Sequence, residues 1–115
     1  MKILRANTIL YCRRWSETVG FYADGIGLPI LMQKEWFVEF SLGNGTALSV
    51  ADQARTSIDS AQGNGITISL RVEDAAGTRS SLLKAGLNPG QMRQSWGRDA
   101  FFIRDPEGNR LEFWS

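Results

Sequence analysis

The sequence predicts an α+β fold in which one pattern of strands and a helix occurs twice. Each half contains a strand candidate, a helix candidate and then further strand candidates joined by short turns. The strand starting at residue 67 follows the one starting at residue 7 by 60 positions, and the last strands align at a similar shift, with Ser49 opposite Glu112. Because self-similarity at a fixed interval is the signature of a repeated module, a duplication accounts for this pattern better than chance.

The length and composition suit one folded domain covering residues 1–115. The chain has 115 residues, of which 43% are hydrophobic and 22% are charged, close to the average of globular proteins. Within this domain we place module one at about 1–52, a linker at about 53–64 and module two at about 65–115. The linker contains Ser, Gln, Asp, Asn and Gly, a composition typical of a loop.

Charge, hydropathy and cysteine content exclude several classes of protein. The formal net charge is +1 and no basic run exceeds Arg13-Arg14, so the chain lacks the concentrated basic face of a nucleic-acid-binding protein. No segment approaches the roughly 18 apolar residues of a membrane span, and the N-terminus lacks the apolar core of a signal peptide. The single cysteine, Cys12, cannot form an intrachain disulfide. We therefore expect a cytoplasmic protein that binds neither nucleic acid nor membrane.

The first half begins with a strand and an amphipathic helix. Residues 7–12 are rich in β-branched and aromatic side chains, which favours a strand. Ser16 is the expected N-cap of a helix whose apolar stripe repeats at three- and four-residue steps and whose far end is stopped by glycines. The stripe consists of Trp15, Val19, Tyr22 and Ile26, and the terminating glycines are Gly25 and Gly27. Strands at 36–42 and 46–50 then flank Asn44-Gly45, the strongest short signal for a β-hairpin.

The second half follows the same order. A strand at 66–72 precedes a helix that begins after the expected N-cap Asp74 and ends near Ala85, where Gly86 follows. Strands at 101–104 and 110–114 surround the turn 105–109, whose Asp-Pro-Glu-Gly-Asn composition suits a tight turn. We expect loops at 30–36 and 90–99, and these would shape any pocket.

Alternation along the strands separates their side chains into two faces. One face is almost wholly apolar and is expected to pack under the helices: Thr8, Leu10, Cys12, Leu48, Val50, Ile68, Leu70, Val72, Leu111 and Phe113. The other face is mixed: Asn7, Ile9, Tyr11, Ala47, Ser49, Thr67, Ser69, Arg71, Arg110, Glu112 and Trp114. A solvent-exposed sheet face gives the same pattern. The aromatic side chains of Tyr11 and Trp114, with the charged Arg71 and Glu112, favour a ligand pocket.

Two motifs resemble those of a known family. The run Asp105-Pro106-Glu107-Gly108-Asn109-Arg110-Leu111-Glu112-Phe113 is similar to the closing hairpin of the vicinal oxygen chelate superfamily, which includes glyoxalase I, extradiol dioxygenases and the fosfomycin- and bleomycin-resistance proteins. Phe21-Tyr22 followed by Gly25-Ile26-Gly27-Leu28 resembles the first-helix motif of that superfamily. The resemblance covers nearly the whole chain. It implies two tandem βαβββ modules that form cup-shaped half-barrels, commonly within a homodimer.

The resemblance also implies four ligand positions, which metal-dependent members typically fill with His, Glu, His and Glu. In this sequence the matching residues are Asn7, Ser49, Thr67 and Glu112. Histidine is absent from the chain, which removes the commonest metal ligand and the commonest general base. Zinc, nickel and iron favour imidazole, carboxylate or thiolate ligands, and magnesium usually needs more negative charge than one carboxylate supplies. We therefore expect no cofactor and no divalent metal.

The polar residues of the mixed face allow more than one interpretation. Glu112 is either a surface carboxylate paired with Arg71 or Arg110, or a group that anchors a ligand or acts as catalytic acid or base, with Tyr11 as a second catalytic candidate. The two arginines could instead hold an anionic ligand. The candidate ligand-binding residues are Asn7, Ser49, Thr67, Arg71, Trp96, Arg110, Trp114 and Trp36.

Three functions fit these residues. The first is a metal-independent binding protein of the glyoxalase/bleomycin-resistance type that sequesters a small aromatic or amphipathic molecule. It rests on the missing metal ligands, on the tryptophans, of which Trp36 and Trp96 could stack on a flat ligand, and on the drug-binding branch of the family that the sequence resembles. The second is a lyase, isomerase or dioxygenase-like enzyme that uses Glu112 as acid or base, or a reconstituted metal site. The third is an accessory subunit with no small-molecule role.

Overall fold

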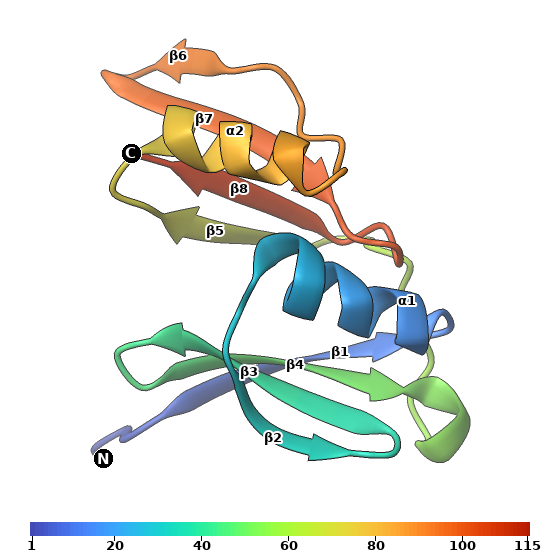
Figure 1. Cartoon of the computed structure of the whole chain (residues 1–115). Helices are drawn as coiled ribbons and strands as arrows, with labels where there is room; N and C mark the ends of the chain where they lie inside the picture. Colours follow the sequence, from blue (N-terminus) through green and yellow to red (C-terminus); the bar gives the residue numbers. More distant parts are fainter. The chain divides into compact units, whose positions relative to one another are not determined.

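The structure is a computed structural model that describes all residues from 1 to 115. It contains two compact units, Met1–Gln62 (unit 1) and Gly63–Ser115 (unit 2), which are drawn in Figure 1. None of the helices is both long enough and apolar enough to span a membrane.

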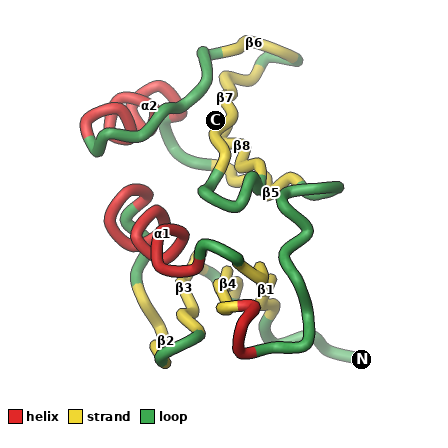
Figure 2. Tube along the Cα trace, turned by 90° about the vertical axis from the view of Figure 1, so that its right-hand side faces the viewer, coloured by secondary structure: helices red, strands yellow, loops and turns green.

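Unit 1 is a four-stranded sheet covered by one helix. Its elements are β1 (Ala6–Cys12), α1 (Trp15–Gly20) continued by a π-helical segment (Phe21–Ile26), β2 (Ile30–Lys34), β3 (Phe37–Gly43), β4 (Thr46–Asp52) and a short 3-10 turn (Gln53–Arg55). The strand order is β1-β4-β3-β2, with β1 parallel to β4 and the other pairs antiparallel. Figure 2 shows α1 on one side of this sheet.

Unit 2 repeats the topology of unit 1. Its elements are β5 (Thr67–Arg71), α2 (Ala75–Lys84), β6 (Arg93–Ser95), β7 (Arg98–Arg104) and β8 (Arg110–Trp114). The strand order is β5-β8-β7-β6, with β5 parallel to β8. Ser49 lies opposite Ile9 in unit 1, and Glu112 lies opposite Ser69 in unit 2. The predicted α+β fold of two βαβββ modules is therefore confirmed, and Ser49 and Glu112 occupy equivalent positions.

Two strands lie where the sequence predicts loops. β2 falls within 30–36 and β6 falls within 90–99, and both are edge strands in which every residue is exposed. β6 is moreover only three polar residues long. Because these strands form by hydrogen bonding to β3 and β7 and bury no face of their own, neither shows the apolar alternation that identifies a strand in a sequence.

The first helix begins one residue before the predicted N-cap. α1 starts at Trp15, and Arg14 occupies the cap position, where its side chain makes no capping hydrogen bond and instead pairs with Glu17, so the prediction of Ser16 as N-cap is wrong. The indole Nε1 of Trp15 donates to the carbonyl of Val50 at 3.0 Å, which ties the start of the helix to β4. A tertiary contact therefore sets this end, whereas α2 has the predicted cap, Asp74, whose carboxylate accepts from the backbone N–H of Gly77.

Each unit has its core between the helix and the apolar face of its sheet. In unit 1 the rings of Tyr22 and Phe40 lie 5.9 Å apart, and Phe40 pairs with Leu48 on the face that α1 covers. In unit 2 the rings of Phe101 and Phe113 stack at 5.3 Å. The opposite face of each sheet, which we call the open face, carries the candidate site residues.

Candidate functional site

Two of the predicted residues meet on the open face of unit 1. Asn7 and Ser49 come from the neighbouring strands β1 and β4, and the Ser49 hydroxyl donates to Asn7 Oδ1 at 2.8 Å. Ser49 is fully buried, whereas Asn7 is exposed. Tyr11 lies on the same face of β1 two positions beyond Ile9, and it is half-buried. Trp36 lies in the turn between β2 and β3, with its ring 5.6 Å from that of Phe37.

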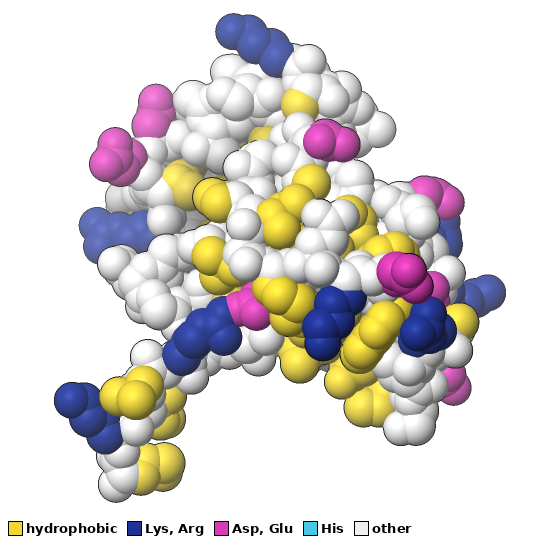
Figure 3. Space-filling view, turned by 60° about the horizontal axis from the view of Figure 1, so that its bottom comes forward, with side chains coloured by type: hydrophobic (Ala, Val, Ile, Leu, Met, Phe, Trp, Pro, Cys, Tyr) yellow, Lys and Arg dark blue, Asp and Glu magenta, His cyan; other side chains and the backbone are white.

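A buried carboxylate that sequence reasoning missed lies beside this pair. Glu39 on β3 is directly opposite Ser49 on β4 and is only 7% exposed. Its Oε2 atom is shielded from solvent and forms an ion pair with the guanidinium of Arg5, from the segment that precedes β1. That segment, residues 1–5, is exposed throughout and projects from unit 1 (Figure 3). Glu39 is the one charged residue in the largely apolar run 36–42, and this was the signal in the sequence that could have identified it.

Replacing Arg5 by Gln is expected to lower the free energy of unfolding by about 1 kcal/mol. A buried carboxylate without its counter-ion is strongly destabilising, and the loss is reduced here because the Arg5 side chain is 48% exposed. Urea denaturation would measure it, with Lys2→Gln in the same exposed segment as the charge-matched control. The double variant with Glu39→Gln should recover the loss. Equal stabilities of the Arg5 and Lys2 variants would show that the ion pair contributes nothing.

The open face of unit 2 brings Thr67 and Arg110 together. Arg110 Nε donates to the Thr67 hydroxyl at 2.8 Å, and its guanidinium lies 4.4 Å from the centroid of the Phe102 ring. Glu112, on the same strand as Arg110, accepts a hydrogen bond from the Ser69 hydroxyl. Neither Arg71 nor Arg110 forms an ion pair with Glu112, so the arginines of this face are not neutralised by it.

Two arginines contact the ring of Trp114 at the end of the same sheet. Arg71 is its register partner on β5, and its Cζ atom lies 5.3 Å from the Trp114 ring centroid. Arg98 approaches the ring to 4.4 Å from β7. Sequence reasoning missed Arg98, because it placed this residue in a loop and so gave it no face. We call Arg71, Arg98 and Trp114 the arginine–tryptophan cluster.

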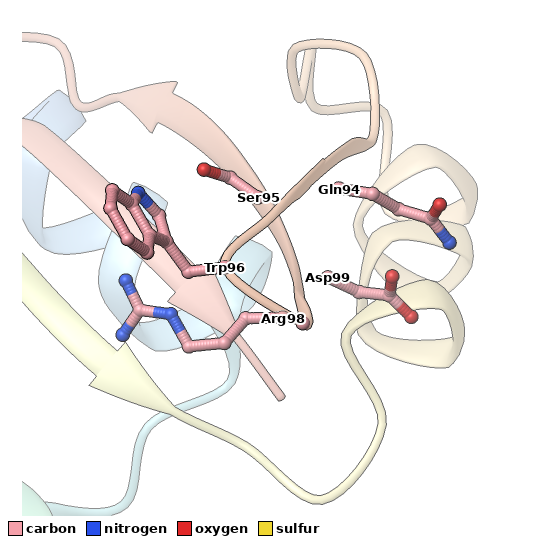
Figure 4. A pocket seen from close by; sticks show the side chains of 6 residues that line it. Gln94, Ser95, Trp96, Arg98 and Asp99 are labelled. Atoms are coloured by element: carbon pink, nitrogen blue, oxygen red, sulfur yellow. The ribbon is translucent and has the colours of Figure 1, made fainter.

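Trp96 lies at the tip of the hairpin between β6 and β7 and is 93% exposed. Figure 4 shows its indole on the same side of the hairpin as the Arg98 side chain, whereas Gln94 and Asp99 point the other way. Residues 94–99 line an open hollow of about 310 Å³. A second hollow of about 360 Å³ is lined by Arg71, Val72, Glu73 and Ser115.

The residues at the four implied metal positions do not fit a transition metal. The side-chain oxygens of Asn7 and Thr67 already accept hydrogen bonds from Ser49 and Arg110. Glu112 is the one carboxylate among the four, and its oxygen accepts from Ser69. No group of three or more His, Cys, Asp or Glu side chains comes together as a metal site. The guanidinium of Arg110 beside Thr67 would also repel a cation at that position.

The sequence matches the family model of the glyoxalase/bleomycin resistance protein/dioxygenase superfamily over residues 4–113. The chain belongs to this superfamily. The resemblance to the vicinal oxygen chelate proteins is thereby confirmed. A search of curated proteins found no significant match to the sequence.

Solved structures with this fold are numerous but distant in sequence. A lactoylglutathione lyase from Agrobacterium tumefaciens is 21% identical with a TM-score of 0.75, covering 95% of this chain and 90% of its own. A glyoxalase/bleomycin resistance protein from Streptomyces sp. CB03234 is 16% identical with a TM-score of 0.76, covering 96% and 99%. An antibiotic-binding protein from the same organism is 15% identical with a TM-score of 0.78, covering 98% and 94%. At these identities the similarity establishes the fold, which hosts many functions.

Proposed function

We propose that this protein is a metal-independent small-molecule-binding protein whose ligand is aromatic and stacks on Trp96 at the open face of unit 2. The proposal includes a homodimer as the working form. The antibiotic-binding protein with the same fold supports a binding role. The donor set at the implied metal positions supports a function without a metal.

The observation that carries the proposal is the conformation of Trp96. Its φ is +55° and that of Gly97 is +72°, which closely matches Asn44 at +50° and Gly45 at +76° in the β3–β4 hairpin. Asn-Gly is the preferred pair for such a turn, because Asn tolerates a positive φ and Trp does not. Trp96 therefore occupies a strained position and, at 93% exposure, recovers almost no burial energy in return. Stacking on a ligand best explains an exposed indole at a position of unfavourable backbone conformation.

The variant Trp96→Asn tests this proposal without endangering the fold. The replacement creates the Asn-Gly pair already present in unit 1, so stability should be unchanged or raised by up to about 1 kcal/mol. Binding of planar aromatic compounds, found by ligand-observed NMR and measured by calorimetry, should weaken roughly tenfold.

Trp15→Phe is the matched control. Trp15 lies in unit 1, where its indole donates a hydrogen bond to Val50, so this variant should leave the affinity for aromatic compounds unchanged. The proposal fails if no neutral, acidic or basic planar aromatic compound binds. It also fails if Trp96→Asn binds every ligand as tightly as the unmodified protein.

A further inference from the structure

We propose that the ligand is an aromatic acid, whose anionic group is held by Arg71 and Arg98 while its ring stacks on Trp96. This inference rests on the proposed function and adds the chemical class of the ligand. The anionic group is a carboxylate or another planar oxyanion, to which a guanidinium can donate two parallel hydrogen bonds.

The arginine–tryptophan cluster holds its two guanidinium groups in place without using their hydrogen-bond donors. Both groups lie over the Trp114 ring, at 5.3 Å for Arg71 and 4.4 Å for Arg98. A cation–π contact of this kind uses no hydrogen-bond acceptor of the protein, so the N–H donors of the guanidinium stay available to a ligand. Neither side chain donates a hydrogen bond to the protein or forms an ion pair with a carboxylate. The cluster is therefore ordered for an anion before the anion binds.

The charge of the surrounding face has the sign that such a ligand needs. Five arginines of the sheet lie on it against one glutamate: Arg71, Arg93, Arg98, Arg104, Arg110 and Glu112. Arg104 donates a hydrogen bond to the carbonyl of Gly108, and Arg110 donates one from Nε to the Thr67 hydroxyl. Of the three arginines without a hydrogen bond, Arg71 and Arg98 belong to the cluster and Arg93 lies on the edge strand β6. A face on which arginines outnumber carboxylates in this way attracts anions and repels cations.

The position of Trp96 indicates where the aromatic ring of the ligand would bind. Arg98 lines the 310 Å³ hollow together with Trp96, and Arg71 lines the 360 Å³ hollow. Trp96 and Arg98 project to the same side of the hairpin (Figure 4). A ring lying on the exposed indole can thus present an attached carboxylate to Arg98. Hollows of this size suit small ligands rather than large ones.

Three naphthalene derivatives of nearly equal shape test the charge of the ligand. Naphthalene-2-carboxylate, 2-naphthamide and 2-naphthamidinium carry a negative, zero and positive charge, and their affinities can be compared by calorimetry at low salt. The carboxylate should bind at least about tenfold more tightly than the amide, and the amidinium more weakly than either. Raising the salt concentration to about 0.5 M should reduce the advantage of the carboxylate, because exposed guanidinium groups are screened.

The variants Arg71→Gln and Arg98→Gln should each remove most of the carboxylate's advantage and leave the amide's affinity nearly unchanged. Lys84→Gln, which removes one positive charge from the exposed last turn of α2, is the control and should preserve the advantage. Equal affinities of the acid and the amide, or an advantage that survives both arginine variants, would overturn the charge assignment while the proposed function stands. Failure of all three compounds to bind at about 1 mM would overturn the proposed function itself.

Discussion

Replacing Gly63 by Ala is expected to destabilise unit 2 by about 3 kcal/mol or more. A Cβ atom at this position would lie 2.1 Å from the carbonyl oxygen of Gly108 and 2.4 Å from its carbonyl carbon. Both atoms belong to the backbone of the β7–β8 turn, so a side chain rotation cannot relieve the overlap. Gly63 also has a φ of +81°, which L-residues with a side chain rarely adopt. The segment 63–65 can pack against the turn only because it carries no side chain there.

Gly65→Ala provides the matched control for this prediction. Its φ of +76° is nearly the same, but a Cβ atom there would meet nothing within 4 Å. The control should therefore show the backbone strain alone, about 1 kcal/mol. Urea denaturation of both variants gives the comparison, and the difference between them measures the close approach of Gly63 to Gly108. If the two variants lost equal stability, the packing of residue 63 on the turn would be refuted.

Replacing Asp105 by Ala is expected to lower the free energy of unfolding by about 3 kcal/mol, since it removes three buried hydrogen bonds. Asp105 Oδ1 accepts from the backbone N–H groups of Glu107 and Asn109, and Oδ2 accepts from Asn109 Nδ2, each at 2.9 Å. Asp105 and Asn109 are only 5% and 6% exposed, so water cannot replace the lost acceptor. Two backbone donors would be left unsatisfied, and such donors are more costly than the bonds themselves are worth.

Asp105→Asn separates the two parts of this network. The amide oxygen can still accept from both backbone N–H groups, whereas the new NH₂ group faces the donor Asn109 Nδ2. We expect this variant to lose about half as much stability as Asp105→Ala. Asp59→Ala, at an exposed position of the segment between the two sheets, is the control. Chemical denaturation that found Asp105→Ala no less stable than Asp59→Ala would show that the turn does not depend on this carboxylate.

Turns and buried strands were the parts of the fold that could be predicted from sequence. Asn44-Gly45 predicted a hairpin because a positive φ at both residues requires that chemistry, and the observed angles are +50° and +76°. Asp74 predicted a helix start because its carboxylate satisfies a free backbone N–H. Each of these signals is local. The edge strands β2 and β6 were missed because only their pairing partners make them strands.

The candidate site was only partly predictable for the same reason. Alternation along β5 and β8 placed Arg71 and Trp114 on one face, because the strand period holds whatever packs around it. Arg98 joins them only once β7 is seen to begin at that residue. The role of Glu39 could not be predicted, because its ion-pair partner Arg5 lies more than thirty residues earlier in the chain. Contacts of this kind depend on strand order, which a sequence pattern does not contain.

The sequence by itself determined the two-module α+β fold, its turns and the absence of histidine from the face where the superfamily binds metals. These follow from local chemistry: side-chain period, turn conformation and residue type. The tertiary structure alone decided that two arginines with free donors lie on Trp114 and that the turn at 105–109 is buried against a glycine. It also revealed the exposed Trp96 in a conformation suited to Asn. The physical reason is that burial, register and backbone approach arise between segments distant in sequence, where no local preference acts.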